Sequence, residues 1–107
     1  MLGQSLLAKA MFFIAFMLVF KPSTSLDILG LWDMAVRRYS DWQCSKVGDE
    51  SLKLEYQKAC DLTLGDGLDL EQVYEDQDAQ FFVDKGVKRG IARRFVRDIE
   101  VWATHYM

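Results

Sequence analysis

The chain has 107 residues, of which 50% are hydrophobic and 27% charged, and its formal net charge at pH 7 is −3. This length suits one small domain. One proline and seven glycines exclude collagen-like and Pro/Gly-rich disordered chains, and two cysteines exclude a dense disulfide framework or a four-cysteine zinc site.

The first 25 residues have the three regions of a secretory signal peptide. Lys9 is the only charged side chain before an uninterrupted apolar run at residues 10–20. Pro22 follows this run and would end its helix, and small residues occupy positions 23–25, where signal peptidase reads the chain. This order indicates a protein that leaves the cytoplasm.

We expect cleavage between Ser25 and Leu26, which leaves a small helical domain at residues 26–107. The alternative is an uncleaved membrane anchor at residues 2–20, with the Lys9 amine at the bilayer surface. The sequence therefore predicts a periplasmic or secreted protein, or one that the N-terminal segment holds in the membrane.

Three segments with helical periodicity come first in the domain. The first begins after Asp27 as a candidate N-cap and continues to Trp42. The second begins after Asp49, a second candidate cap, and ends before the turn signal at residues 65–67. The third begins at Asp69, which has a glutamine three residues later as in a capping box, and its apolar positions extend to Phe81.

The fourth segment, residues 87–106, has the most regular pattern. Its apolar residues fall within about a third of the helix circumference; they are Val87, Ile91, Phe95, Ile99, Trp102 and Tyr106. Arg89, Arg93 and Arg97 follow one another at intervals of four on the opposite side. Because alternation typical of strands is scarce, we predict an all-α bundle of three to four helices behind the signal peptide or anchor.

Charge is divided between two consecutive stretches of the chain. Residues 66–78 contain six acidic side chains and no basic one, whereas residues 85–97 contain six basic side chains and no acidic one. We expect the two helices to pack against each other and to neutralise part of this charge.

Cys44 and Cys60 are expected to form a disulfide, which is the default for two cysteines in an exported protein. The bond sets a geometric condition. A first helix that continued to Cys44 and turned back tightly would leave Cys60 about 15 Å away. The disulfide therefore requires that helix to end near Ser40; two buried free thiols are the alternative.

No constellation of residues favours catalysis. His105 is the only histidine and lies near the end of the chain, so a cysteine–histidine pair or a zinc site with the two cysteines is disfavoured. Residues 61–71 resemble a calcium loop only loosely, and residues 86–90 lack the pattern of a phosphate-binding loop. We predict a protein that is not an enzyme and that has no metal and no cofactor.

The predicted function is binding to another envelope or secreted protein, in an accessory, immunity or exclusion role. Arg89, Arg93, Arg97 and Trp102 are the candidate residues of the surface that would contact this partner, or a membrane surface. Nucleic acid is not expected, because an exported acidic domain would repel it. A homodimer would be one way to bury the three tryptophans.

The alternative function is that of a small membrane-active protein of the toxin or lysis type. It would use residues 2–20 and the basic amphipathic helix expected at residues 87–106.

Overall fold

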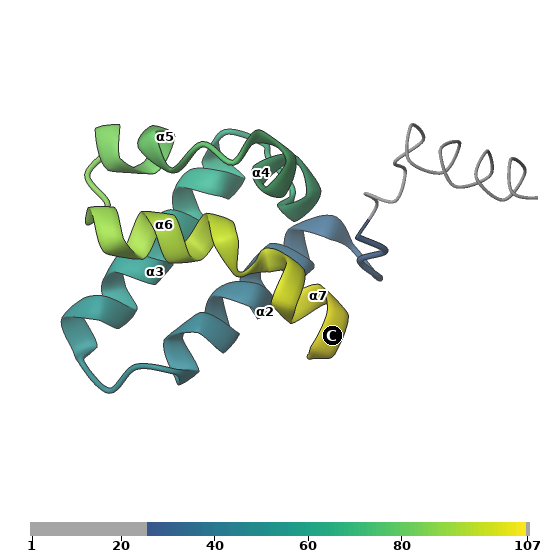
Figure 1. The fold of residues 1–107 in the computed structure, drawn as a ribbon, viewed down its shortest axis with the longest axis horizontal. Coiled ribbons are helices and arrows are strands. Elements are labelled where there is room, and N and C mark those ends of the chain that lie inside the picture. Colours follow the sequence, from purple (N-terminus) through teal and green to yellow (C-terminus); the bar gives the residue numbers. More distant parts are fainter. Residues whose placement is uncertain (1–25, 107) are drawn as a thin grey trace, which may run out of the picture.

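A computed structural model describes residues 26–106, and every regular element between these residues is an α-helix (Figure 1). The all-α prediction is confirmed, but the helices are shorter and more numerous than the three to four expected. They are α2 (Trp32–Ser45), α3 (Glu50–Gly65), α4 (Leu70–Asp76), α5 (Ala79–Asp84), α6 (Arg89–Arg97) and α7 (Ile99–His105). The predicted signal peptide or anchor, and Ser25 of its cleavage site, lie outside the described residues.

The first helix begins later than the sequence predicted. Asp27 does not cap it: this residue has a φ of +43°, and Gly30 has a φ of +87°, both in the left-handed region. Because neither conformation can continue a right-handed helix, the chain forms α2 only from Trp32 onward. Leu31 occupies the N-cap position without a side-chain hydrogen bond.

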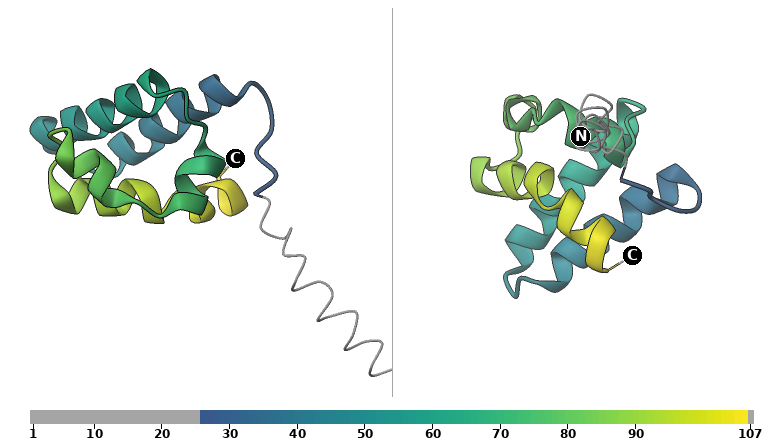
Figure 2. Two further views of the ribbon diagram at one scale, coloured as in Figure 1. Left: turned by 90° about the horizontal axis from the view of Figure 1, so that it is seen from above. Right: turned by 45° about the vertical axis from the view of Figure 1, so that its right-hand side comes forward.

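α2 and α3 pack side by side as an antiparallel pair (Figure 2). The Ser40 hydroxyl lies 3.4 Å from the Tyr56 carbonyl oxygen, and the Cys60 sulfur lies 4.0 Å from the Val36 carbonyl oxygen. As the chain advances along α2, its contacts therefore move backward along α3. The predicted cap of α3 is confirmed, since the Asp49 carboxylate accepts a hydrogen bond from the Ser51 backbone N–H at 2.8 Å.

The predicted third helix is divided into α4 and α5. Its start is confirmed: Asp69 and Gln72 form the expected capping box, each side chain bonding the backbone of the other residue. The helix ends at Gln77, which has a φ of +47°, and Asp78 then caps α5 by accepting from the Phe81 N–H at 3.2 Å. A new cap directly after a left-handed residue ends one helix and begins another.

The predicted fourth helix is likewise divided, with Asp98 between α6 and α7. Hydrogen bonds from the Asp98 N–H to the Arg94 carbonyl (2.9 Å) and from the Trp102 N–H to the Asp98 carbonyl (3.1 Å) continue across the junction. The chain therefore bends there without forming a loop, and α7 turns away from the direction of α6 (Figure 1). Val87 precedes the first turn and is buried.

One hydrophobic core connects the six helices. Its largest fully buried apolar side chains come one from each helix; they are Tyr39, Tyr56, Leu70, Phe82, Phe95 and Ile99. Phe95 lies at the centre, with ring centroids 5.1 Å from Tyr39 and 5.3 Å from Phe82. Between residues 26 and 106, no helix combines the length and the hydropathy needed to cross a bilayer.

Candidate binding surface

α6 separates apolar from basic residues more sharply than the two longer helices α2 and α3 do. Ile91, Ala92, Phe95 and Val96 are buried, whereas the four arginines of the helix are exposed. We call this exposed surface the basic face; it consists of Arg89, Arg93, Arg94 and Arg97. The sequence placed three of these residues on one side of a helix, and the structure brings them together there.

The start of α6 is fixed to α3. A carboxylate oxygen of Glu55 accepts a hydrogen bond from the Lys88 backbone N–H at 2.9 Å, and this bond is the main reason why the pKa of Glu55 is lowered. Lys58 donates to the other oxygen of Glu55 at 3.1 Å and to the Gly86 carbonyl at 2.9 Å. Because Lys88 itself provides no side-chain cap, the carboxylate from α3 takes that role and holds the basic face in place.

Arg97 differs from the other arginines of the basic face because it has a carboxylate partner. Its Nε lies 2.8 Å from Oδ1 of Asp98, and its Nη2 lies 3.4 Å from Oδ2. This contact raises the pKa of Arg97 and takes up part of its hydrogen-bonding capacity. Arg97 is therefore less available to a partner than Arg89 or Arg93.

Asp98 also connects the α6–α7 junction to α2. Its Oδ2 accepts a hydrogen bond from Gln43 Nε2 at 3.4 Å and lies 3.4 Å from Lys46 Nζ. Only 7% of Asp98 is exposed. Burial raises the pKa of Asp98, but Arg97, Lys46 and Gln43 together outweigh burial, so that the pKa is lowered overall. The carboxylate is thus charged at neutral pH and holds three cationic or polar groups.

A second buried contact lies beside Asp98. The Tyr39 hydroxyl donates to the Phe95 carbonyl at 2.6 Å and accepts from Gln43 Nε2 at 2.9 Å. Burial is the main cause of the strongly raised pKa of Tyr39, so this hydroxyl keeps its proton. α2 is therefore joined to α6 and α7 by a buried polar network as well as by apolar packing.

The acidic and basic stretches do not neutralise each other as expected. α4 and α6 are in contact, yet none of the ion pairs in the described part of the chain joins residues 66–78 to residues 85–97. Arg89 and Arg93 form no ion pair with any residue between 26 and 106. The basic face therefore keeps much of its charge directed toward solvent.

Trp102, which the sequence placed on the binding surface, is in the core. It is 4% exposed, and its ring centroid lies 5.5 Å from that of Tyr39 in an edge-on arrangement. After the bend at Asp98, Trp102 contacts Tyr39 of α2 and Tyr106 contacts Trp42 of α2. Of the four predicted surface residues, only Arg89, Arg93 and Arg97 are exposed.

The expected disulfide does not form: Cys44 and Cys60 are both free. α2 continues to Ser45, past Ser40, so the condition for the bond is not met. In the antiparallel pair, Cys44 lies 3.5 Å from the Lys53 carbonyl, seven residues from Cys60 and hence about 10 Å along α3. Each cysteine thus contacts backbone near a different end of the pair.

Neither cysteine lies in a site that would activate it. Burial raises the pKa of both thiols, Cys60 is 4% exposed, and His105 is an exposed residue of α7. An open hollow beside Cys60 is bordered by Asp41 and Asp61, whose charges disfavour a thiolate further. Between residues 26 and 106, no three histidine, cysteine or acidic side chains are grouped as a metal site would require.

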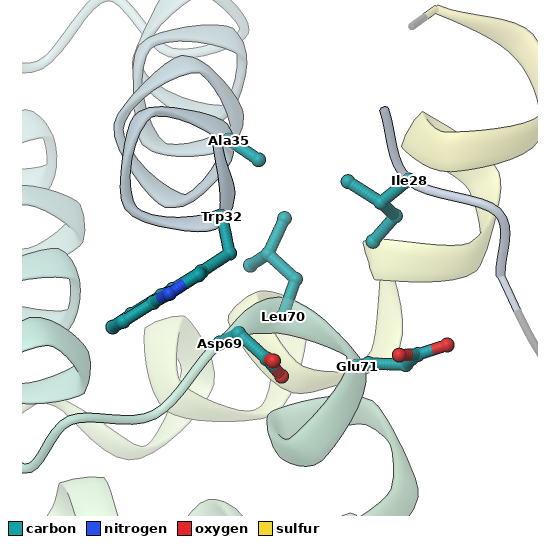
Figure 3. Close-up of a pocket in the computed structure, with 6 residues that line it drawn as sticks. All are labelled: Ile28, Trp32, Ala35, Asp69, Leu70 and Glu71. Carbon is teal, nitrogen blue, oxygen red and sulfur yellow. The ribbon is translucent and has the colours of Figure 1, made fainter. Parts of the chain in front are cut away.

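A small cavity lies between the first described residues, α2 and the start of α4 (Figure 3). Ile28, Ala35 and Leu70 point into it, whereas the carboxylates of Asp69 and Glu71 point away. Its volume is about 70 Å³, well below the roughly 300–1,000 Å³ of small-molecule sites. The cavity is a packing gap under the N-terminal segment.

The sequence analysis did not identify Asp98 as the residue that links α2 to the α6–α7 junction, although the apolar pattern contained a signal for its burial. Counting in helical steps from Ile91 and Phe95, position 98 falls on the apolar side of the predicted helix, where a carboxylate needs a partner. Gln43 on α2 is the corresponding signal, because it follows Tyr39 by four residues on the buried side of that helix. Both residues pointed to a buried polar contact between these helices.

No family model matches the chain, and no curated protein or solved structure matches it. Its residues define a small all-α domain with a rigid basic surface on one helix.

Proposed function

We propose that this chain is a non-enzymatic binding protein whose basic face docks on an acidic surface of another protein. The observation that carries the proposal is the state of Arg89 and Arg93: both are exposed, and neither has an ion-pair partner between residues 26 and 106. A guanidinium is a planar fork that binds a carboxylate through two hydrogen bonds, so two of them on a rigid helix suit an acidic protein surface.

The location that we propose for this interaction is the cell envelope or the exterior of the cell. The support comes from the pattern of residues 1–25, which has the charge, apolar run and small residues of a secretory signal. A net charge of −3 disfavours nucleic acid as the partner. An accessory, immunity or exclusion role, in which one small protein blocks or assists another, is consistent with this combination.

Photocrosslinking on the full chain identifies the partner. A photoreactive amino acid replaces Arg93 in one variant and Arg37 in another, because Arg37 is an exposed arginine of α2 outside the basic face. We expect the Arg93 position to capture one envelope protein that the Arg37 position does not.

Affinity for the purified partner then tests the basic face. Arg93→Glu should raise the Kd about tenfold or more, because it replaces an attractive charge with a repulsive one. Arg37→Glu makes the same change of charge on α2 and should leave the Kd within about twofold. Circular dichroism should show both variants folded. Equal loss of affinity in the two variants, or none in either, contradicts the proposal.

A further inference from the structure

A second surface of the domain is apolar and exposed. Leu29 is 68% exposed, Leu31 71%, Met34 44% and Tyr106 61%. We call these four residues the apolar end. Leucines and a methionine exposed to this degree within six consecutive positions are unusual on a small soluble domain.

The residues of the apolar end come from α2, the segment before it and the C-cap of α7. Leu31, Met34 and Trp42 follow one another at helical spacing, which places them on one side of α2. The Trp42 and Tyr106 rings contact each other, with their centroids 5.1 Å apart. Both border a groove that Leu29 and the charged side chains of Arg38 and Asp41 also line. Arg38 donates to the Leu29 carbonyl at 3.3 Å and so fixes the segment beside the groove. Figure 2 shows this segment and α7 at the same end of the domain.

The chain leaves the described domain at this same end. Leu26 is the first described residue, and the apolar run at residues 10–20 ends six positions before it. Fully extended backbone of that length spans about 20 Å. A bilayer that held the uncleaved anchor, residues 2–20, would therefore lie within reach of the apolar end. Tryptophan and tyrosine, which line the groove here, are the side chains enriched where membranes meet water.

We propose that, when the N-terminal segment is retained as the anchor at residues 2–20, the apolar end docks on the surface of the bilayer that holds this anchor. Leu29, Leu31 and Met34 enter the outer apolar layer, and the Tyr106 hydroxyl remains at the level of the headgroups. α6 begins at the opposite end of the domain (Figure 1), so docking leaves the start of this helix away from the lipid. The contact does not depend on the partner of the basic face.

Spin labels on the full chain test the contact. The label is attached at Leu31→Cys, with Leu54→Cys as the matched control, because Leu54 is 61% exposed on α3 and lies outside the apolar end. Both variants carry Cys44→Ala and Cys60→Ala, so that only one thiol reacts. The chain is reconstituted into phosphatidylcholine vesicles, and the label's collision rates with oxygen and with a water-soluble nickel complex are measured by electron paramagnetic resonance.

We expect the label at position 31 to collide mainly with oxygen, which concentrates in lipid, and the label at position 54 mainly with nickel. Adding Met34→Glu should lower the ratio of docked to undocked domain about tenfold, because a charge replaces an apolar side chain in the lipid.

Nickel collisions at position 31 in a folded domain would overturn the proposal. So would shielding from both reagents, which indicates that a second copy or residues 10–20 covers the surface. Leu29→Cys replaces Leu31→Cys if that variant does not fold.

Discussion

Gln43 and Asp98 lie 55 positions apart in the chain, yet the Gln43 amide donates to the Asp98 carboxylate at 3.4 Å. Gln43 is fully buried in α2, and Asp98 is the residue at which α6 gives way to α7. The contact therefore sets where the C-terminal part of the chain bends and how α7 lies on α2. Arg97, the last residue of α6 and a member of the basic face, also binds Asp98. The bend at Asp98 therefore fixes one end of the basic face.

Asp98 should make the stability of the domain depend on pH. Its folded-state pKa is lowered, so its contribution is fully present above the unfolded-state pKa of about 3.9 and is lost as the pH falls through the folded-state pKa. We expect the free energy of unfolding, measured by urea titration, to fall between about pH 5 and pH 2. Asp98→Asn should flatten this fall. An equally steep fall in the variant would assign the effect to other carboxylates.

Tyr39→Phe should destabilise the domain by about 1–3 kcal/mol. The substitution removes the hydroxyl that bonds the Phe95 carbonyl and the Gln43 amide, and it leaves buried polar groups without that partner. Tyr74→Phe is the matched control, because the Tyr74 hydroxyl bonds Glu100 at an exposed position. The control should cost less than about 0.5 kcal/mol. An equal loss of unfolding free energy in the two variants, measured by thermal or urea unfolding, would show that the buried Tyr39 hydroxyl stabilises the domain no more than the exposed Tyr74 hydroxyl does.

The cysteines should remain unbonded when the folded protein is exposed to air. We expect the intact mass of the purified chain to be the same with and without a reducing agent, and the melting temperature to be unaffected by that agent. Thiol reagents should modify Cys60 only slowly, because it is 4% exposed and burial raises its pKa. An intramolecular Cys44–Cys60 bond in the native protein would mean that the register of α2 and α3 differs from the one described.

Helical character and caps were predictable because they depend on neighbouring residues. Asp49 and the capping box of Asp69 are local signals, and both operate as the sequence indicated. The apolar pattern of residues 87–106 also identified the buried side of α6 correctly, and with it the exposure of Arg89 and Arg93.

The bends were not predictable from local pattern. Gln77 adopts a left-handed conformation and Asp98 interrupts a regular periodicity, and neither residue carries a strong breaking signal of its own. Asp98 bends the chain where its carboxylate meets Gln43 and Lys46 of α2, a contact between elements that are distant in sequence. The burial of Trp102 follows from the same bend, and so it was missed together with it.

The antiparallel register of α2 and α3 has a consequence for where the chain can fold. Because the register keeps the two sulfur atoms apart, the native state contains no bond that an oxidant has to make. Formation of the domain therefore needs neither oxidising equivalents nor an enzyme that shuffles disulfides. The same helices can assemble in a reducing and in an oxidising environment, so folding and transport need not occur in a fixed order.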